Sequence, residues 1–363
     1  MSAKDAKYWL AVNETGALGA NSQARLFNFF KSMKIAFTAP LPDLLKAGIK
    51  QSSAQKFIDR RAKINPDKLW QIIREKHIKI ITLADKNYPP LLKTIYDPPA
   101  LLYLRGNLPQ NINKYIAIIG SRRADFYGIK VAKKISSELA EQNFTIVSGL
   151  AYGIDELAHK SAINHKTPTI AVLGFGVLYK GTQRQQALIN AILKSGGAII
   201  SEFPLFAAGL KHHYPIRNRI ISGLCRATII IQAAAKSGSL ITAQTALEQG
   251  REIFAVPGPI TSLNSAGTNQ LIKDGAHPLT CLNDIFDVLK VAKISKDRQN
   301  KNYSPKNQAE KIILNALSRY GQLSTNQLIC LAKLPTSTIM SALSILELKN
   351  IVHKNKHDLY TKQ

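Results

Sequence analysis

Residues 115–149, YIAIIGSRRADFYGIKVAKKISSELAEQNFTIVSG, contain the first strand–helix–strand pattern of the central part of the chain. Two short apolar runs rich in β-branched residues, YIAIIG (115–120) and FTIVSG (144–149), enclose the helical stretch GIKVAKKISSELAEQ. A strand, a helix and a second strand in this order predict a parallel pair, because parallel strands need a crossover of this length. Strands of such a sheet are covered on both faces, which explains why these runs are apolar throughout rather than alternating.

The same unit repeats along the central part of the chain. Four more buried strands are predicted in PTIAVLG (168–174), GAIISE (197–202), ATIIIQA (227–233) and EIFAVPG (252–258), with helices such as LITAQTALEQG between them. This alternation predicts an α/β fold with a doubly wound, mainly parallel sheet. Nearly every predicted strand ends in glycine or serine, at the edge where open α/β sheets bind ligands.

The segments on either side of this core differ in pattern. Residues 1–106 predict a helical domain that closes in a proline-rich connector, and residues 107–289 form the predicted α/β domain. Residues 290–308 are polar, basic and without periodicity, so they predict a linker. Residues 309–363 predict three helices and a short β hairpin. That is the pattern of a winged helix, whose third helix or wing contacts DNA or protein.

The charge is the unusual feature of the composition. The chain has 49 Lys and Arg against 23 Asp and Glu, a net charge of +26. The excess is spread over the N-terminal, central and C-terminal segments, so no single tail explains it. A polyanionic partner is the expected cause, and a lineage-wide lysine bias is the alternative.

Cysteine and apolar patterns indicate the compartment. The three cysteines, Cys225, Cys281 and Cys330, lie far apart with no CxxC pair, which argues against a disulfide framework and a zinc site. This sparse use fits a reducing compartment. No signal-peptide core and no apolar run of about 18 residues are evident, so we expect a cytoplasmic protein without a membrane segment.

The loop after the first central strand has the residues of an anion site. Gly120 permits a tight turn, Ser121 offers a hydroxyl, and Arg122 and Arg123 stand beside the start of the next helix. A helix N-terminus attracts anions through its free N–H groups and its dipole. We therefore favour anion binding here over a plain solvated loop.

A second small, cationic turn follows the fifth central strand. Lys236, Ser237, Gly238 and Ser239 open the stretch KSGSLITAQTAL, and Ser239 is the predicted N-cap of its helix. Small residues before a helix let a phosphate approach the backbone. A capping requirement explains one serine, but not the lysine and the second serine beside it.

The segment YPIRNRIISGL (214–224) combines a ring and two arginines with an apolar helix. Pro215 suits the first turn of that helix. Arg217 and Arg219 lie about 200° apart around it, so only one can face a ligand at the helix mouth. The other is expected to pair with a carboxylate or a neighbouring subunit. Tyr214 is placed to stack on a base, and a tyrosine of the core is the alternative.

No residue pattern indicates catalysis. In SGLAYGIDELAH, Gly149 allows close backbone approach, and Asp155 and His159 share one face of a helix. A structural hydrogen bond fits this pair better than acid–base chemistry, because no nucleophile accompanies it.

Nucleotide cofactors are disfavoured as well. The loop LGFGVLYKG has Gly174 and Gly176, but Tyr179 stands where the third glycine of GxGxxG belongs. The chain has no GxxxxGK[ST] motif for a P-loop. We expect no bound cofactor and no metal.

Five motifs carry a family resemblance. In chain order, GSRR, SGLAYGIDELAH, YPIRNRIISGL, KSGSLITA and AVPGP…AGTNQLIKDGA closely resemble the DNA-processing protein A family (DprA/Smf). The N-terminal YWLAVNETGALG and YPPLLKTIYDPPALLYLRG resemble its helical domain, which is similar to a sterile alpha motif, and its connector. The C-terminal segment resembles the winged helix of many members.

The resemblance implies an extended Rossmann domain that binds single-stranded DNA without sequence preference. Such proteins protect incoming DNA during natural transformation, load the recombinase RecA onto it, form homodimers through this domain and are not enzymes. The alternative is a Rossmann-type hydrolase that processes nucleotides. A transcriptional regulator that uses the winged helix is a third, weaker interpretation.

The resemblance also implies the DNA-binding residues of the pocket. Together with the turn and helix residues around them, they are Ser121, Arg122, Arg123, Lys211, Tyr214, Arg217, Asn218, Arg219, Lys236, Ser237, Gly238 and Ser239. The chain departs from the family pattern at two places. Leu178 stands at an aspartate position in the third loop, with Gly181 and Thr182 in place of Tyr-Pro, and Gln232 replaces a glutamate after the fifth strand. Both changes remove acidity beside the proposed pocket.

Overall fold

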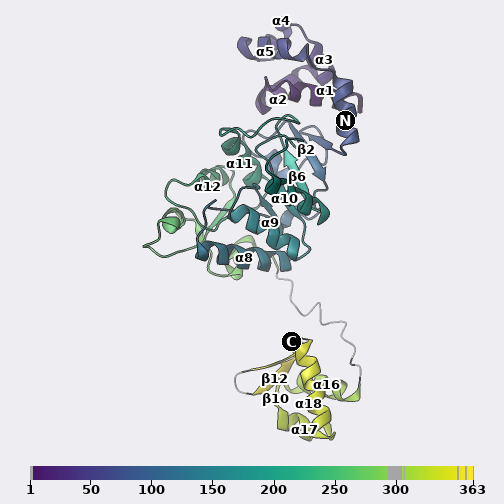
Figure 1. Cartoon of the computed structure of the whole chain (residues 1–363), viewed down its shortest axis with the longest axis vertical. Coiled ribbons are helices and arrows are strands. Elements are labelled where there is room, and N and C mark those ends of the chain that lie inside the picture. The colour runs from purple at the N-terminus through teal and green to yellow at the C-terminus, as the bar shows by residue number, and fades with distance from the viewer. Residues whose placement is uncertain (1–2, 293–304, 306, 350, 356–357, 363) are drawn as a thin grey trace. The chain divides into compact units, whose positions relative to one another are not determined.

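The computed structural model describes residues 3–292, 305, 307–349, 351–355 and 358–362 (Figure 1). The chain divides into two compact units, Met1–Val291 and Ala292–Gln363. Most of the predicted linker, residues 293–304 and 306, lies outside the described residues.

Six helices precede the first strand. They are α1 (Ala3–Glu14), α2 (Ala20–Phe30), α3 (Met33–Thr38), α4 (Leu41–Lys46), α5 (Gln51–Arg61) and α6 (Pro66–Glu75). Their apolar faces meet around large buried side chains such as Trp9, Leu26 and Phe57. Asn65 caps α6 by accepting hydrogen bonds from the N–H groups of Asp67 and Lys68, as expected for asparagine before an N1 proline.

The helical prediction for the N-terminal segment is wrong for one short stretch, and the predicted connector contains a strand. Lys79–Thr82 forms β1, and Leu101–Gly106 forms β2, with the short helix α7 (Pro90–Lys93) between them. These two strands pair antiparallel with each other, and β2 continues the central sheet by pairing antiparallel with β6. The residues on both sides of position 106 therefore share one sheet.

The central sheet has nine strands in the order β1-β2-β6-β5-β4-β3-β7-β8-β9. From β6 to β9 all neighbours are parallel. The six predicted strands are confirmed, and β9 is an addition at the edge. Their bounds are β3 (Tyr115–Ile119), β4 (Thr145–Ser148), β5 (Thr169–Val172), β6 (Ala198–Ser201), β7 (Ala227–Ile230), β8 (Glu252–Ala255) and β9 (His277–Pro278).

Helices cover both faces of this sheet, as alternate residues of β3 show. Tyr115, Ala117 and Ile119 pack in the core that α11 and α12 close, whereas Ile116 and Ile118 pack in the core that α8, α9 and α14 close. The doubly wound prediction is confirmed (Figure 1). The helices are α8 (Phe126–Glu141), α9 (Ile154–Asn164), α10 (Gln183–Lys194), α11 (His213–Gly223), α12 (Gly238–Glu248), α13 (Ala266–Lys273) and α14 (Leu282–Leu289).

The strand order reverses between β3 and β7. From β3 the chain moves outward through β4 and β5 to β6, then returns to place β7 on the other side of β3. The loops that leave β3 and β7 therefore diverge in opposite directions. Such a switch point opens a crevice at the carboxyl edge of a sheet, where ligands bind.

Among its described residues, the second unit contains three helices and a three-stranded antiparallel sheet. Its elements are α16 (Gln308–Tyr320), β10 (Gln322–Ser324), α17 (Thr325–Ala332), α18 (Thr336–Leu348), β11 (Val352–Lys354) and β12 (Leu359–Lys362), and the strand order is β10-β12-β11. The three predicted helices and the β pair are present, and β10 is an addition. Ile313, Leu328 and Leu343 lie in its core.

Among the described residues, no single helix is long and apolar enough to cross a membrane.

Candidate functional site

A cavity of about 700 Å³ lies at the switch point. We call it the switch-point cavity. Its walls come from the loop after β3, the loop after β7 and the segment that leads into α11. It is lined by eleven residues that the sequence analysis singled out: Gly120, Ser121, Arg122, Arg123, Lys211, Tyr214, Arg217, Asn218, Ser237, Gly238 and Ser239.

Arg122 and Tyr214 contact each other in the wall of the cavity. The guanidinium carbon of Arg122 lies 5.4 Å from the centre of the Tyr214 ring, a cation–π contact. Glycines make room for the ring, because a Cβ at Gly174 would lie 2.8 Å from its Cδ1 and a Cβ at Gly209 would lie 2.8 Å from its hydroxyl. The predicted free ring is thus half-buried and has a cation over it. A base that stacks there either displaces Arg122 or shares the ring with it.

Arg217 lines the cavity, and its guanidinium is hydrogen-bonded to the protein backbone. Only 3% of the residue is exposed. Its Nη1 donates hydrogen bonds to the carbonyl oxygens of Gly149, at 2.6 Å, and Val172. A Cβ at position 149 would lie 2.5 Å from its Nη2, so glycine is required there. Burial lowers the pKa of Arg217 to about 10, although the neighbouring Asp155 opposes this shift.

Asp155 holds the same corner from the other side. Its carboxylate accepts hydrogen bonds from the N–H groups of Gly149, at 3.1 Å, and Ala151, at 3.4 Å. Burial raises the pKa of Asp155, and the charge of Arg217 opposes that shift. Asp155 and Arg217 therefore hold the turn after β4 by separate hydrogen bonds to its backbone, and their opposite charges stabilise each other.

Arg219 and Lys236 do not line the switch-point cavity. Arg219 is buried on another side of α11, where Nε lies 2.8 Å from Asp97 and Nη2 lies 2.6 Å from Glu202. This agrees with the expectation that one of the two arginines pairs with a carboxylate. Lys236 is exposed on the loop before α12.

The turn after β7 is shaped by its serines. Helix α12 begins at Gly238, and Ser237 is its N-cap, so the prediction of Ser239 as the cap is wrong. Ser237 has the extended backbone that a cap needs, and its Oγ accepts a 3.3 Å hydrogen bond from the N–H of Ser239. The two hydroxyls lie 2.7 Å apart. Both serines reach the cavity from the first turn of the helix.

His159 makes a buried hydrogen bond within the α/β core. The ring is fully buried, and its Nδ1 lies 2.8 Å from the hydroxyl of Thr169. Burial lowers its pKa to about 3, and the charge of Arg217 adds to the shift. This is the structural hydrogen bond that the sequence favoured. Among the described residues, no group of three His, Cys, Asp or Glu side chains is placed to hold a metal ion.

Comparison with known proteins decides the family. The family model of DNA recombination-mediator protein A matches residues 79–290, which include the sheet and every wall of the switch-point cavity. The chain belongs to this family. Protein Smf of Escherichia coli is 35% identical over 307 residues, which span 84% of this chain and 81% of that relative.

Two solved structures of the family are similar to this fold. The X-ray structure of DNA processing protein A from Streptococcus pneumoniae is 33% identical with a TM-score of 0.66, and the match covers 76% of this chain and 95% of that one. The second is DNA processing protein A from Helicobacter pylori, 28% identical with a TM-score of 0.52, covering 59% of this chain and 95% of that one. The resemblance seen in the motifs is confirmed.

Gln232 stands where a glutamate is expected from the family pattern, and its side chain is hydrogen-bonded to Asp125. Its Nε2 donates a 2.8 Å hydrogen bond to Asp125, whose own N–H donates to the Gln232 Oε1 at 3.2 Å. Asp125 also caps α8 by accepting a hydrogen bond from Gly128, the main reason that its pKa is lowered. A carboxylate thus remains beside the cavity, and a glutamine suits it better than a second acid.

Sequence reasoning missed part of this wall. Asn264, from the loop after β8, lines the cavity and donates a 3.2 Å hydrogen bond to Asp125. The polar stretch SLNS before α13 is the sequence feature that could have indicated Asn264.

The third loop contributes less than the other loops. Gly174 supports Tyr214, but a Cβ at Gly176 would lie against the carbonyl oxygens of Pro204 and Leu205. The N–H of Leu178 donates a 2.8 Å hydrogen bond to Leu205. Gly176 and Leu178 thus belong to the packing of this loop on the segment after β6, and neither lines the switch-point cavity.

Proposed function

We propose that the chain binds single-stranded DNA in the switch-point cavity without sequence preference. The observation that carries the proposal is the convergence of eleven singled-out residues from separate loops on one cavity. The chain's net charge of +26 supports a polyanionic ligand. The solved Helicobacter pylori relative concerns the single-stranded DNA binding mode of that protein, which supports the same class of ligand here.

The chemistry of the cavity suits a sugar–phosphate strand. Arg122, Arg123 and Lys211 supply positive charge at the walls, and the hydroxyls of Ser121 and Ser237 supply hydrogen bonds that phosphates accept. Tyr214 supplies a ring, and stacking on a ring tolerates every base. These contacts predict affinity that depends strongly on salt and weakly on sequence.

A nucleotide hydrolase fits the cavity poorly. Asp155 is the carboxylate among the described lining residues, and it is buried with hydrogen bonds to backbone N–H groups beside Arg217. A buried acid in this position lacks the exposure needed for attack on a substrate. We therefore propose a mediator without catalytic activity.

We further propose that the chain acts as a cytoplasmic homodimer that protects incoming DNA and loads RecA onto it during natural transformation. Membership of the DNA recombination-mediator protein A family supports this role. We assign α16–α18 with β10–β12 to a winged helix, because the described elements follow the order helix, strand, helix, helix, strand, strand, and the three strands form an antiparallel sheet. The N-terminal helices are assigned to a module that resembles a sterile alpha motif.

Fluorescence anisotropy with a labelled oligo-dT, titrated at several salt concentrations, tests the proposed function. We expect Tyr214→Ala to lose about 1–3 kcal/mol of binding free energy through lost stacking. Arg122→Ala is expected to lower the slope of log affinity against log salt by about 0.7, the loss of one phosphate contact. Lys194→Gln is the matched control, because Lys194 is exposed at the end of α10, at the opposite edge of the sheet. If both cavity variants bind like this control, the site is wrong.

A further inference from the structure

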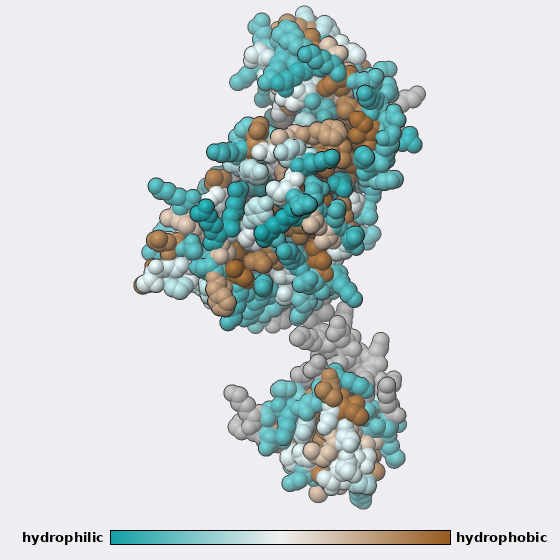
Figure 2. All heavy atoms as spheres, viewed as in Figure 1, coloured by the Kyte–Doolittle hydropathy of each residue, from teal (hydrophilic) through white to brown (hydrophobic). Residues whose placement is uncertain are grey.

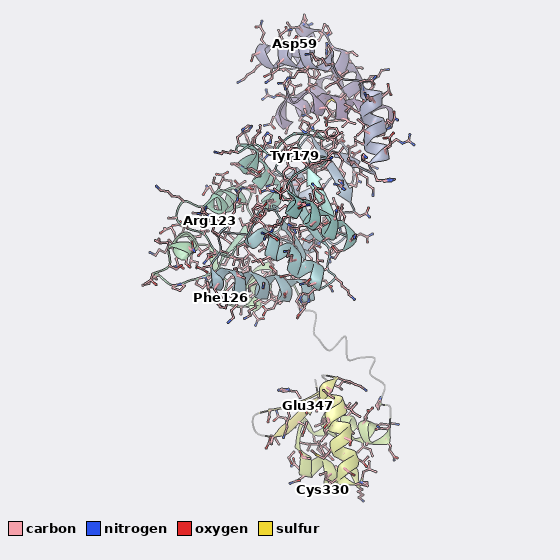
Figure 3. The ribbon with its side chains drawn as sticks, viewed as in Figure 1. Asp59, Arg123, Phe126, Tyr179, Cys330 and Glu347 are labelled. Carbon is pink, nitrogen blue, oxygen red and sulfur yellow. The ribbon has the colours of Figure 1, made fainter. Side chains whose placement is uncertain are left out.

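Beyond the switch-point cavity, helix α8 carries an exposed aromatic ring at its first residue. Phe126 is 82% exposed and follows Arg123, which lines the cavity, by three residues. Figure 3 labels both residues, and Phe126 lies at the end of α8 that follows the loop after β3. Nothing in helix formation favours phenylalanine at this position, and a ring left in water loses the stabilisation of burial. An exposed ring beside a cationic cavity therefore indicates a ligand that covers it.

The face of α8 behind this ring is cationic. Lys130 and Lys133 are four and seven residues after Phe126, within about 40° of it around the helix, and both are exposed. Neither lysine has an ion pair among the described residues. Lys134, by contrast, lies about 80° from Phe126 and is 3.9 Å from Glu138. The positive charge that remains free is thus aligned with the exposed ring.

The loop after β8 adds an uncharged rim on the same side. Its residues Ile260 and Leu263 are 96% and 84% exposed, and the next residue, Asn264, lines the cavity. The hydroxyl of Tyr127, beside Phe126, donates a 2.7 Å hydrogen bond to Pro257 and ties this loop to the start of α8. Figure 2 shows apolar surface next to hydrophilic surface at this corner of the first unit.

We propose that the outer face of α8 extends the binding path for a single strand. In this proposal, which rests on the proposed function, the strand leaves the cavity at Arg123, stacks a base on Phe126 and places phosphates at Lys130 and Lys133. The distance from the first to the last of these helical positions is about 10 Å along the axis. A single strand suits this face better than a duplex, because the bases of a duplex are already stacked and cannot cover the ring.

Oligonucleotides of two lengths separate this path from the cavity. We compare oligo-dT of about 4 and about 16 nucleotides, since single-strand sites cover lengths of this order. Both are measured on wild type, Phe126→Ala, Phe126→Trp, Lys130→Gln/Lys133→Gln and the control Lys134→Gln. All altered side chains are exposed, and an unchanged thermal melt shows that each variant is folded.

We expect the variants to change the affinity for the longer oligonucleotide and to leave the affinity for the shorter one unchanged. For the longer strand, Phe126→Ala weakens binding about 5- to 100-fold, whereas Phe126→Trp keeps the ring and binds like wild type. The double lysine variant lowers the salt slope by about 1.4, two phosphates at 0.7 each, and Lys134→Gln leaves it unchanged. The shorter oligonucleotide binds all variants alike.

Two results would overturn the α8 path while leaving the cavity intact. One is a double lysine variant that binds the longer strand like Lys134→Gln. The other is a duplex of the same length that loses as much affinity as the single strand when Phe126 becomes alanine. A short oligonucleotide that fails to bind wild type would instead overturn the cavity itself, and the path with it.

Discussion

Replacing Arg217 by methionine removes a buried charge while keeping much of the side-chain volume. Arg217 is 3% exposed, and its guanidinium donates hydrogen bonds to the carbonyl oxygens of Gly149 and Val172 near the buried Asp155. The variant leaves the Asp155 carboxylate buried without its counter-charge. Leaving a buried charge without its compensating charge costs about 3–5 kcal/mol. We expect the unfolding free energy of the first unit to fall by this amount.

Urea unfolding followed by tryptophan fluorescence measures the effect. Both tryptophans, Trp9 and Trp70, lie in the first unit, so the signal reports that unit. Arg122→Ala is the comparison, because an exposed arginine is expected to change stability by less than about 0.5 kcal/mol while weakening DNA binding. The double variant Asp155→Asn/Arg217→Met is expected to regain about 1–2 kcal/mol, since it buries no unpaired charge. Unchanged stability of the single variant together with lost DNA binding would contradict this structural role and make Arg217 a direct ligand of the strand.

Three further predictions follow from contacts near the cavity. Gly174→Ala places a methyl group 2.8 Å from the Tyr214 ring, so we expect it to displace the ring and weaken oligo-dT binding about tenfold; unchanged anisotropy would contradict this. The pKa of His159 is about 3 in the folded state, so acid favours the unfolded state, whose histidine binds a proton below about pH 6.5. Between pH 7 and pH 5, urea titrations should show a stability loss about 2 kcal/mol smaller in His159→Asn than in wild type. Gln232→Glu places a second carboxylate 2.8 Å from Asp125, and we expect the free energy of unfolding to fall by about 1–3 kcal/mol in urea titrations or thermal melts. Adding Asp125→Asn should restore this stability, whereas an equal loss in the single and the double variant would exclude repulsion between the carboxylates as the cause.

The parallel core was readable from the sequence because strands buried on both faces are apolar throughout. The six runs from Tyr115 to Ala255 gave strand type and order along the chain, and their carboxyl ends pointed to the loops of the site. The strands β1 and β2 were not readable, because LLYLRG pairs with β6, almost a hundred residues later, and no local pattern reports that partner. The cap of α12 at Ser237 was missed by two residues, because Ser237 and Ser239 offer the same local chemistry.

The residue types indicate the class of the proposed site: arginines, small polar residues and a ring after the strands of a doubly wound sheet, in a strongly basic chain. How those residues divide their roles depends on packing in three dimensions. Arg217 and Arg219, two positions apart, both became buried, one against backbone carbonyls near Asp155 and the other against Asp97 and Glu202. Arg122 and Lys211 stayed exposed at the cavity. The physical reason is that a buried charge needs partners, and those partners come from strands and loops whose distance in the chain gives no hint of their proximity in space.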